Sequence, residues 1–560
     1  MKVLIVPIAL VAITFAQIPL PSNPDWRSSD NDYSTGGSFA DVNGDGYIDF
    51  LISNGNDMAN NSNSVYLNES GTLENTASWR SADQGNFGHS YTGDVNNDGL
   101  LDLAVAYLGP DTSTTKMVTR IYLNNGAGLD SQPYWRAADR VSSFDCCLGD
   151  YDLDGDLDLA ISAGDAYQEE MDRVRIYKNN AGVFETMPSW YSKLDTASDA
   201  IRFADIDNDG DLDLFVGHRR KIVMYRNENG SLDTIPSWVA RKNVGWVLRL
   251  AFGDYDGDGY LDLAAAANDQ LGDPNGIMVF HNNNGSLDTV ATFHMQRQGR
   301  NNYSSCVAWG DVNGDGYPEL AAGGWWKPVV VYQNHNGMLD TLPAWSWYPS
   351  YPEKLVGEAL VWGDIRNCHL EASTDTFTGN GIQKLFHLSH RPVQFLDSVL
   401  VNGVLCSNTQ YCYDPLLGWI SFATPPTAGS DGVQVYYRYS TYPDLAVTNW
   451  EPNEGNYLFL NTTPTSIAEA QPLRMVSQLK VVNSLGWGMV SIQSINDNPL
   501  PPTIAIYSQE GRLVNEFKRQ TEFKAVWNGR GKNGEQIPAG IYFLTISGYE
   551  PVKLIRLRQE

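Results

Sequence analysis

The stretch GDYDLDGDLDLA, residues 149–160, places an aspartate at every second position from Asp150 to Asp158, with Gly155 at its centre. Carboxylates this close together repel one another, and an apolar core would not accept them without a counter-charge. Side-chain oxygens at positions 1, 3 and 5, a backbone carbonyl at position 7 and a carboxylate at position 9 can surround one hard cation, while glycine at position 6 permits the sharp turn. Calcium suits such flexible oxygen geometry better than magnesium does, so the stretch predicts a calcium loop.

The same phrase recurs at a nearly fixed interval, so the chain contains a true internal repeat. Six copies, each roughly 55 residues from the next, begin at Asp41, Asp94, Asp150, Asp205, Asp254 and Asp311. Each is followed by an aliphatic run, then by a YxNxxGxL phrase such as IYLNNGAGL, and in most units by a PxW phrase such as MPSW. About four short β-rich runs per unit, separated by glycine and asparagine, are typical of the blades of a β-propeller.

A seventh unit is interrupted but readable. ALVWGDIRN (359–367) supplies Asp364 in register with the other loops, and YPDLAVTNW resumes the pattern at Tyr442. Residues 368–441 are therefore inserted into the seventh loop, where Arg366 at position 3 argues against a metal ion. NPDWRSSD (23–30) stands alone before the first unit and is expected to supply the last strand of the seventh blade, which would close the ring and remove its open edges.

The six loops predict about six Ca²⁺ sites, with solvated polar turns as the alternative. An EF-hand is ruled out because position 12 holds an isoleucine inside a strand, Ile52 or Ile161, where an EF-hand has a bidentate glutamate. The predicted ligands are Asp41, Asn43, Asp45, Tyr47 and Asp49; Asp94, Asn96, Asp98, Leu100 and Asp102; Asp150, Asp152, Asp154, Asp156 and Asp158; Asp205, Asp207, Asp209, Asp211 and Asp213; Asp254, Asp256, Asp258, Tyr260 and Asp262; Asp311, Asn313, Asp315, Tyr317 and Glu319. Because the third to fifth loops carry an aspartate at position 3 where the others carry asparagine, we expect them to bind calcium more tightly.

These DxDxDG motifs resemble the FG-GAP/VCBS repeats of integrin-α-type seven-bladed propellers over residues 23–367 and 442–465. The resemblance implies that the calcium loops join the first and second strands of each blade and lie on one face. It also implies that partners bind the opposite face.

Two further modules are expected. Residues 368–441 contain SVLVNGVL, GWISFATPP and GVQVYYRYS, which predict a small β-sandwich over the calcium face; its His387 and His390 should point to opposite sides of a strand. Residues 470–560 resemble the immunoglobulin-like modules that include type IX secretion sorting domains and the flagellar hook-cap fold, through GRLV (511–514), WNGRGKNG (527–534) and PAGIYF (538–543). A plain β-sandwich without a sorting role is the alternative. The predicted fold class is thus all-β: a seven-bladed propeller, a sandwich inserted in blade 7 and a C-terminal Ig-like sandwich.

The composition points to an exported protein. MKVLIVPIALVAITFAQ has one lysine and a short apolar run, which predicts a signal peptide over residues 1–16, and no second long apolar stretch follows. The formal net charge of −28 argues against nucleic acid or an anionic membrane surface as a partner. Cys406 and Cys412 bracket a short turn and could form a disulfide outside the cell, whereas Cys146, Cys147 and Cys306 are expected to be buried thiols.

Tryptophans supply the candidate ligand contacts. Trp325, Trp326 and Trp450 follow strands that should end on the face opposite the loops, where they could stack on sugars or anchor a protein; Arg219 and Arg220 form a basic spot there. The alternative for each is packing between blades or solvation, and the repeated PxW tryptophans are expected to be structural.

Motifs for catalysis are missing: the sequence has no GxSxG, no HExxH and no glycine-rich phosphate loop. We therefore expect a secreted or cell-surface calcium-binding module for an extracellular glycan or protein ligand. A secreted carbohydrate-active enzyme of the polysaccharide lyase kind and a structural surface-layer component remain open as alternatives.

Overall fold

The computed structural model describes residues 18–109, 118–242, 244–271, 276–294, 303–427 and 432–464, and beyond these the strands of a C-terminal unit with residues 530–532. The chain divides into two compact units, residues 1–463 and 464–560. The predicted signal peptide lies outside the described residues. Within the described part of the chain, no helix is both long enough and apolar enough to span a membrane.

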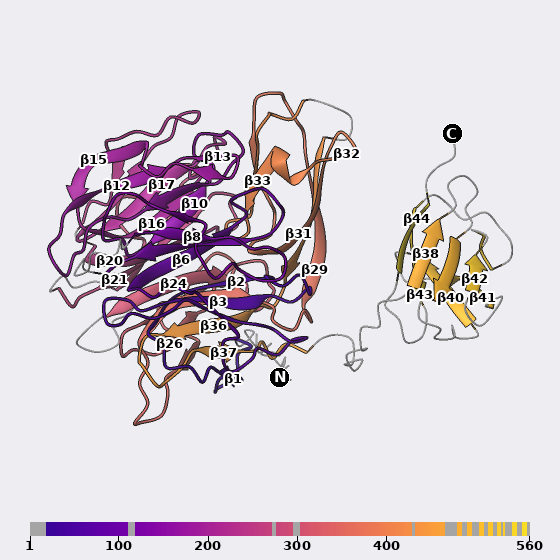
Figure 1. The fold of residues 1–560 in the computed structure, drawn as a ribbon, viewed down its shortest axis with the longest axis horizontal. Coiled ribbons are helices and arrows are strands. Elements are labelled where there is room, and N and C mark those ends of the chain that lie inside the picture. The colour runs from indigo at the N-terminus through magenta and orange to yellow at the C-terminus, as the bar shows by residue number, and fades with distance from the viewer. Residues whose placement is uncertain are drawn as a thin grey trace, which may run out of the picture. The chain divides into compact units, whose positions relative to one another are not determined.

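The first unit is built from four-stranded antiparallel sheets that follow the sequence repeat (Figure 1). Over the described residues, seven such sheets consist of β2 (Ser34–Ala40), β3 (Asp49–Asn54), β4 (Ser64–Tyr66) and β5 (Trp79–Arg80); β6 (Phe87–Gly93), β7 (Asp102–Tyr107), β8 (Arg120–Tyr122) and β9 (Trp135–Arg136); β10 (Cys146–Gly149), β11 (Asp158–Ile161), β12 (Asp172–Tyr177) and β15 (Trp190–Thr196); β16 (Ser198–Ala204), β17 (Asp213–His218), β18 (Lys221–Tyr225) and β19 (Trp238–Val239); β20 (Trp246–Gly253), β21 (Asp262–Asn268), β22 (Ile277–Phe280) and β23 (Phe293–His294); β24 (Ser304–Gly310), β25 (Glu319–Gly324), β26 (Val329–Tyr332) and β27 (Trp345–Trp347); and β28 (Gly357–Gly363), β36 (Asp444–Asn449), β37 (Tyr457–Phe459) and β1 (Trp26–Arg27). A short hairpin, β13 (Asn179–Asn180) and β14 (Val183–Phe184), follows β12.

The sheets form a closed ring. The first strand of each sheet contacts the first strand of the next, and β28 of the seventh sheet contacts β2 of the first. The N-terminal strand β1 pairs with β37 and so completes the seventh sheet, which confirms the expected closure. Closure leaves the ring of first strands without a free edge.

Each repeat phrase contains a residue that fastens one blade to the next. The indole Nε1 groups of Trp79, Trp135, Trp190 and Trp238 donate at 2.6–3.2 Å to the main-chain carbonyls of Leu129, Glu185, Leu232 and Leu287, each in the following blade. At the closure, Trp345 donates to Pro21 and Trp26 donates to Glu74. The repeated tryptophans are therefore structural, as predicted.

Tight packing between blades also explains the glycine that precedes four of the six acidic loops; Ala40 and Ala204 precede the other two. A Cβ at Gly253 would lie 2.6 Å from the ring of Trp309, and one at Gly310 would lie 2.6 Å from the ring of Trp362. Only a residue without a side chain lets the aromatic ring of the next blade pack this closely.

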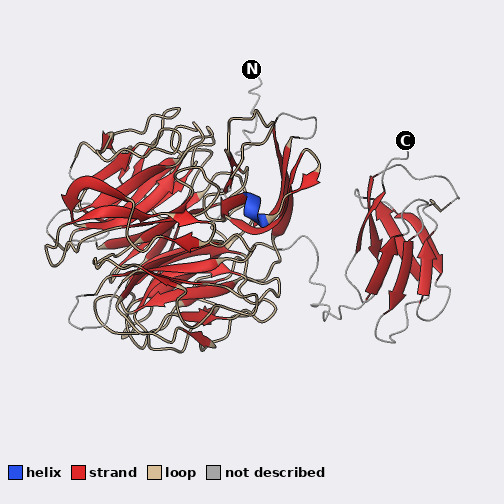
Figure 2. Ribbon diagram, turned by 45° about the horizontal axis from the view of Figure 1, so that its top comes forward, coloured by secondary structure: helices blue, strands red, loops and turns tan. Residues whose placement is uncertain are grey.

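The inserted residues form two facing sheets on the first unit (Figure 2). One sheet contains β29 (Leu370–Phe377), β35 (Val433–Ser440), β31 (Val393–Val401) and β32 (Val404–Leu405), and the other contains β30 (Leu385–His387), β34 (Trp419–Phe422) and β33 (Tyr411–Asp414), with one 3-10 turn at Asn408–Gln410. Phe386, Ile420 and Val435 belong to the core that the two sheets share.

The described residues of the C-terminal unit form β-strands in two sheets. One sheet holds β38 (Leu479–Asn483), β39 (Val490–Ser494) and β42 (Lys524–Trp527); the other holds β41 (Leu513–Lys518), β40 (Thr503–Ser508), β43 (Gly540–Thr545) and β44 (Val552–Arg556). Its immunoglobulin-like class and its sorting role stay predictions.

The disulfide expectation is wrong. All six cysteines are free, and Cys146, Cys147 and Cys306 are buried as expected. Cys406 packs partly buried against the core of the inserted module, whereas Cys412 is buried with Trp419 on the side that packs against the propeller. The two thiols belong to different clusters and so do not meet.

Candidate functional site

The six predicted calcium loops share one main-chain geometry. In each, the N–H of the glycine at position 6 donates to the carboxylate of the aspartate at position 1, as Gly46 does to Asp41 and Gly155 does to Asp150. The position-6 glycines have φ between 87° and 94°. Residues with a Cβ rarely adopt that conformation, so glycine is required for the turn.

The carboxylate at position 9 lies buried behind each loop. In the first loop, Asp49 accepts hydrogen bonds from the N–H of Val42 at 2.9 Å and of Asn68 at 2.7 Å. Burial, followed by the neighbouring carboxylates, raises the pKa of Asp49 to about 7, that of Asp102 to about 8 and that of Glu319 to about 9. Ionising these groups without a nearby cation is therefore unfavourable.

The donor set fits a hard cation in the third to fifth loops. Carboxylate oxygens lie within 4.8 Å of one another in Asp150, Asp152 and Asp158, in Asp205, Asp207 and Asp209, and in Asp254, Asp256 and Asp262. Oxygens at this spacing can converge on a calcium ion, whose ligands stand about 2.3–2.6 Å away. Side chains of the predicted ligands thus meet in these loops; in the other three, asparagine takes position 3.

The same three loops also carry a basic side chain from the neighbouring strand. Lys178 pairs with Asp152 and Asp154, Arg226 pairs with Asp207, and His281 Nε2 lies 2.9 Å from Asp256. These three stand just before the asparagine of the YxN phrase, where the loops with asparagine at position 3 have Leu67, Leu123 and Gln333. Each extra aspartate is therefore matched by a basic side chain of the chain itself, which weakens the expectation that its charge simply tightens calcium binding.

The interrupted seventh loop uses a protein cation. Arg366 Nη2 donates to the carbonyl of Asn461 at 2.8 Å and lies 3.9 Å from Asp444, which occupies the position-9 place. Asp364 accepts hydrogen bonds from the N–H of Arg366 and of His369 instead.

The inserted module lies over the second to fourth loops. Ser421 donates to Asp150 at 2.7 Å, and His387 Nε2 lies 3.0 Å from Asp205. Asp150 and Asp205 are accordingly buried, whereas Asp254 in the fifth loop is only partly covered. His390 stacks on Tyr439 at 3.8 Å, away from His387's partner, so the two histidines do not form one site.

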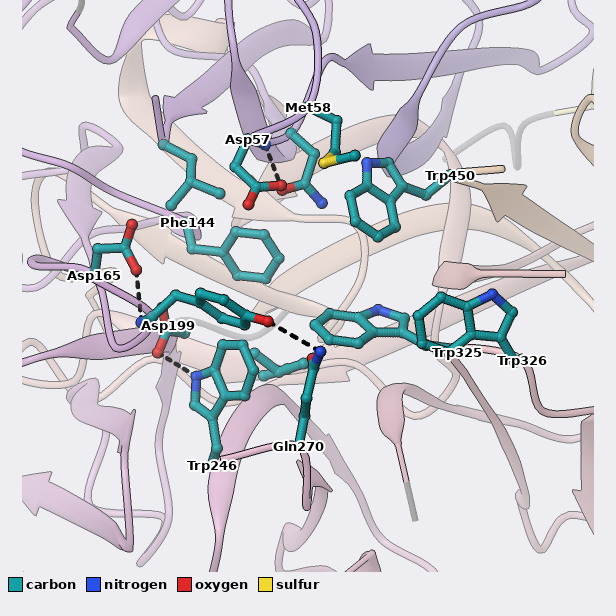
Figure 3. Close-up of a pocket in the computed structure, with 14 residues that line it drawn as sticks. Asp57, Met58, Phe144, Asp165, Asp199, Trp246, Gln270, Trp325, Trp326 and Trp450 are labelled. Carbon is teal, nitrogen blue, oxygen red and sulfur yellow. Dashed lines mark hydrogen bonds between the residues drawn. The ribbon is translucent and has the colours of Figure 1, made fainter. Parts of the chain in front are cut away.

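The opposite face holds a cavity of about 250 Å³ (Figure 3). Every blade contributes to its lining: Asn56, Asp57 and Met58; Leu108; Phe144, Asp165 and Tyr167; Asp199; Trp246, Leu248 and Gln270; Trp325 and Trp326; and Trp450. Because these residues stand at the same end of all seven blades, the cavity lies at the axis of the ring.

Tryptophan rings form one wall of the cavity. Trp325 lies 5.7 Å from Trp246 and 5.9 Å from Trp450 between ring centroids, and Trp326 extends the group at 6.5 Å from Trp325. Trp246 and Trp325 are buried, whereas Trp326 is 44% exposed at the rim.

Two buried carboxylates hold this wall in place. Trp246 Nε1 donates to Asp199 and Trp325 Nε1 donates to Glu358, both at 2.6 Å. Burial raises the pKa of Asp199 to about 7 and that of Glu358 to about 8, and the neighbouring Asp165 and Asp57 act in the same direction.

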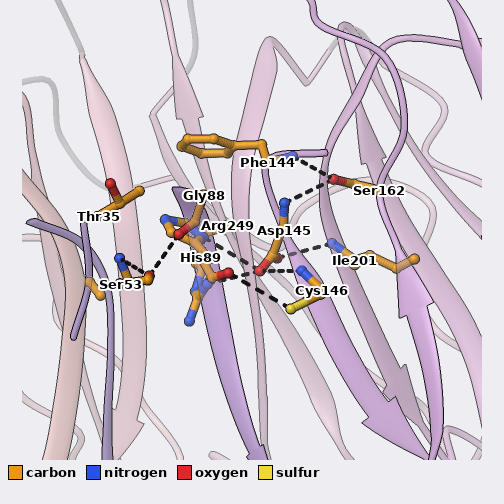
Figure 4. A network of polar contacts seen from close by, with 12 residues as sticks. Thr35, Ser53, Gly88, His89, Phe144, Asp145, Cys146, Ser162, Ile201 and Arg249 are labelled. Atoms are coloured by element: carbon orange, nitrogen blue, oxygen red, sulfur yellow. Dashed lines mark hydrogen bonds and ion pairs between the residues drawn. The ribbon is translucent and has the colours of Figure 1, made fainter. Parts of the chain in front are cut away.

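A buried ionic cluster lies on inner strands of the ring, close to the cavity (Figure 4). Arg202 donates to Asp145 at 2.7 Å, and Arg249 lies 3.2 Å from Asp145 and 2.6 Å from His89 Nδ1. Although burial opposes it, the two guanidinium groups hold the pKa of Asp145 below its usual range, while burial and Arg249 lower the pKa of His89 to about 4. His89 also touches Phe144 of the cavity at 4.7 Å between ring centroids.

The ligand-face candidates divide into two groups. Trp325, Trp326 and Trp450 all line the cavity, whereas Arg219 and Arg220, in the turn between β17 and β18, are not among its lining residues. Sequence reasoning missed Trp246 and Asp199, which stand at the starts of first strands. Their signal was their place at the beginning of WVLRLAFG and SDAIRFA, the strands that lead into an acidic loop.

Comparison with known proteins gives two findings and one negative result. No curated protein matches the chain. A solved structure of an Agrocybe aegerita lectin, described as recognising non-reducing terminal N-acetylglucosamine, is similar at 19% identity with a TM-score of 0.35, covering 56% of this chain and 80% of the lectin chain. The model of the FG-GAP-like repeat matches residues 41–105, 150–216 and 205–265, and these three stretches contain five of the acidic loops described above. The all-β ring is therefore built, over these stretches, from FG-GAP-like repeats.

Proposed function

We propose that this protein is an exported, calcium-stabilised β-propeller that binds an extracellular glycan or protein ligand in the axial cavity. The observation that carries the proposal is the cavity itself, which gathers four tryptophans, a tyrosine and a phenylalanine from four different blades. Aromatic rings with a polar edge are the side chains that most often anchor sugars and protein partners.

Calcium supports this function from the other face. The predicted ligand residues would hold the ion through carboxylate oxygens and one backbone carbonyl per loop, and the ion supplies the positive charge that lets the buried carboxylates ionise. Fixing the loops between first and second strands steadies the strands whose opposite ends line the cavity.

Binding is favoured over a lyase activity by the composition of the lining. A lyase needs a basic residue and a proton acceptor that converge on the sugar, and none of the 14 described lining residues is a lysine, arginine or histidine. The surface-layer alternative predicts self-association, which gel filtration of the mature chain would detect.

The test is a binding screen of the full mature chain against arrayed glycans and surface proteins, with calcium present. Trp326→Ala should abolish captured signals, because Trp326 lies at the open rim of the cavity. Tyr348→Ala is the matched control, since Tyr348 is similarly exposed, at 41%, but is not among the cavity residues. Equal loss in both variants, or no ligand in either screen, would contradict the proposal.

The C-terminal unit is proposed to direct export across an outer membrane, as its resemblance to sorting modules suggests. Deleting residues 470–560 should then retain the chain inside the producing cell. Unchanged release would leave the unit as a plain β-sandwich.

A further inference from the structure

The axial cavity combines aromatic rings with acidic groups in a way that narrows its ligand. Asp57, Asp165 and Asp199 line it together with the tryptophans, and the buried Glu358 lies directly behind Trp325. Among the described lining residues there is no basic side chain to balance these carboxylates. The site therefore places carboxyl groups, without a basic partner among the described lining residues, next to the faces of aromatic rings.

Asp199 is the lining residue on which the nature of the ligand mainly depends. It is 2% exposed, and one carboxylate oxygen accepts the Trp246 indole N–H at 2.6 Å. Among the hydrogen bonds of the described residues, none is made to its other oxygen. A carboxylate this buried normally has a hydrogen-bond partner for each oxygen or a counter-charge beside it. The second oxygen of Asp199 is therefore free to contact a ligand.

The two arginines near the cavity, Arg202 and Arg249, are already paired with other residues. Arg249, which reduces the effect of burial on Glu358, is bound to Asp145 and His89, and Arg202 is bound to Asp145. The two arginines pair with Asp145, which is ionised, whereas Asp199 and Glu358 lie on the cavity side. The cavity thus keeps unneutralised acidic groups.

We propose that the axial cavity recognises an organic cation, a quaternary or alkylated ammonium group carried by its ligand. The ammonium group lies against Trp246 and Trp325 and is neutralised by Asp199. Aromatic faces attract such cations through the ring quadrupole, most strongly where water is excluded. A volume of about 250 Å³ admits an alkylammonium head group, whereas a small hard ion would lack the ring of oxygen ligands that it needs.

This inference rests on the proposed function, because it assumes that the cavity is the binding site, and the experiment separates the two. Choline and its neutral isostere 3,3-dimethyl-1-butanol are titrated into the calcium-loaded full chain, with tryptophan fluorescence and calorimetry as readouts. Choline is expected to bind at least about tenfold more tightly than the isostere.

Two variants locate the effect. Asp199→Asn keeps an acceptor for the Trp246 indole. It should lower the affinity for choline about tenfold and leave the affinity for the isostere unchanged. Asp195→Asn makes the same change of charge at an exposed position of β15 and should change neither. Loss of choline binding in both variants would indicate only a general effect of charge and would overturn the assignment to Asp199.

The remaining outcomes are decisive as well. Equal binding of choline and its isostere, or no choline binding, overturns the cation inference. If a neutral glycan then still binds in a Trp326-dependent way, the proposed function survives without it. If choline binds but the glycan and protein screens stay empty, the cation site stands and the proposed ligand classes fail.

Discussion

The two faces of the propeller both gather carboxylates, but they surround them with different atoms. On the loop face, Asp150 and its equivalents accept backbone N–H groups and converge with other carboxylates. On the cavity face, Asp199 accepts the indole N–H of Trp246, and no hydrogen bond to its other oxygen is found among the described residues. Oxygen-rich loops suit a small hard ion, whereas aromatic walls suit a larger organic one. The lining, rather than the charge, decides which cation each face can take.

Removing calcium is the change that should affect the two faces most unequally. Each occupied site contributes about 2.7 kcal/mol at a hundredfold excess of calcium over its dissociation constant, and chelation also leaves buried carboxylates without a counter-charge. Excess chelator should therefore lower the melting temperature by well over about 10 °C. Thermal unfolding with and without chelator, together with a count of bound metal near six, measures this.

A protein that contains no calcium and melts at the same temperature with chelator would refute the metal assignment. The cavity, whose described lining has no oxygen cage, would then remain as a separate cation site to test. Choline should raise the melting temperature in either case, because it binds the folded chain alone.

On the loop face, replacing Lys178 tests whether this lysine compensates the extra carboxylate at position 3 of the third loop. Lys178→Met leaves Asp152, which is 15% exposed, without its partner and should cost about 1–3 kcal/mol of unfolding free energy in calcium-free buffer. The same variant should bind calcium more tightly, since more uncompensated carboxylate faces the ion. Denaturant unfolding and calcium titration measure the two effects.

Lys193→Met is the matched control, because Lys193 is exposed on the outer strand β15. Adding Asp152→Asn to Lys178→Met should restore stability and recreate the arrangement that the first loop has with Asn43 and Leu67. A variant with unchanged stability and unchanged calcium affinity would show that the ion pair has no compensating role.

A change of pH should affect the cavity face through Asp199. The folded chain raises the pKa of Asp199 from its usual value near 4 to about 7, so the folded state holds a proton that the unfolded state releases. Stability from this group is thus present at low pH and is lost as pH rises from about 4 to about 7, by at most about 1.4 kcal/mol per pH unit. Asp165 and Asp145 face Asp199 and act in the same direction as its burial, while the Trp246 indole opposes them.

Choline affinity should move the other way and increase between pH 5 and pH 8, because the ionised carboxylate is the form that binds. The comparison is between the wild type and Asp199→Asn, in calcium, by unfolding and by titration at each pH. If both proteins show the same pH dependence, Asp199 does not titrate in this range.

The sequence predicted the loop face much better than the cavity face, for a physical reason. A metal loop is local: its oxygens lie within nine consecutive residues, and the repeat displays the pattern six times. The cavity is assembled from all seven blades, so its members are far apart in the chain. Trp325 and Trp450 could be placed on the right face from the strand order. Trp246 and Asp199 stand at the starts of first strands, and that position does not by itself indicate a ligand site.

The basic partners show the same limit within the loops. Lys178 stands 26 positions from Asp152, so its pairing follows only from the register of β11 with β12. That register brings the residue before the YxN asparagine over position 3 of the loop. In the sequence, loops with asparagine at position 3 have a neutral residue before the YxN asparagine, and loops with aspartate at position 3 have a basic one. Without the strand pairing, nothing indicated that these two positions are in contact.

The smallest expected change in stability is at the rim of the cavity, and it separates binding from folding. Trp326 is 44% exposed, so Trp326→Ala should alter the unfolding free energy by only about 0.5 kcal/mol. Trp325, by contrast, is buried and donates to Glu358, and its replacement would leave a buried carboxylate without a donor. Trp326→Ala should therefore retain its melting temperature and calcium content while losing ligand binding. Full ligand affinity in that variant would place the contact surface deeper in the cavity, on Trp325 and Trp450, and a large loss of stability would mean that the rim tryptophan is structural after all.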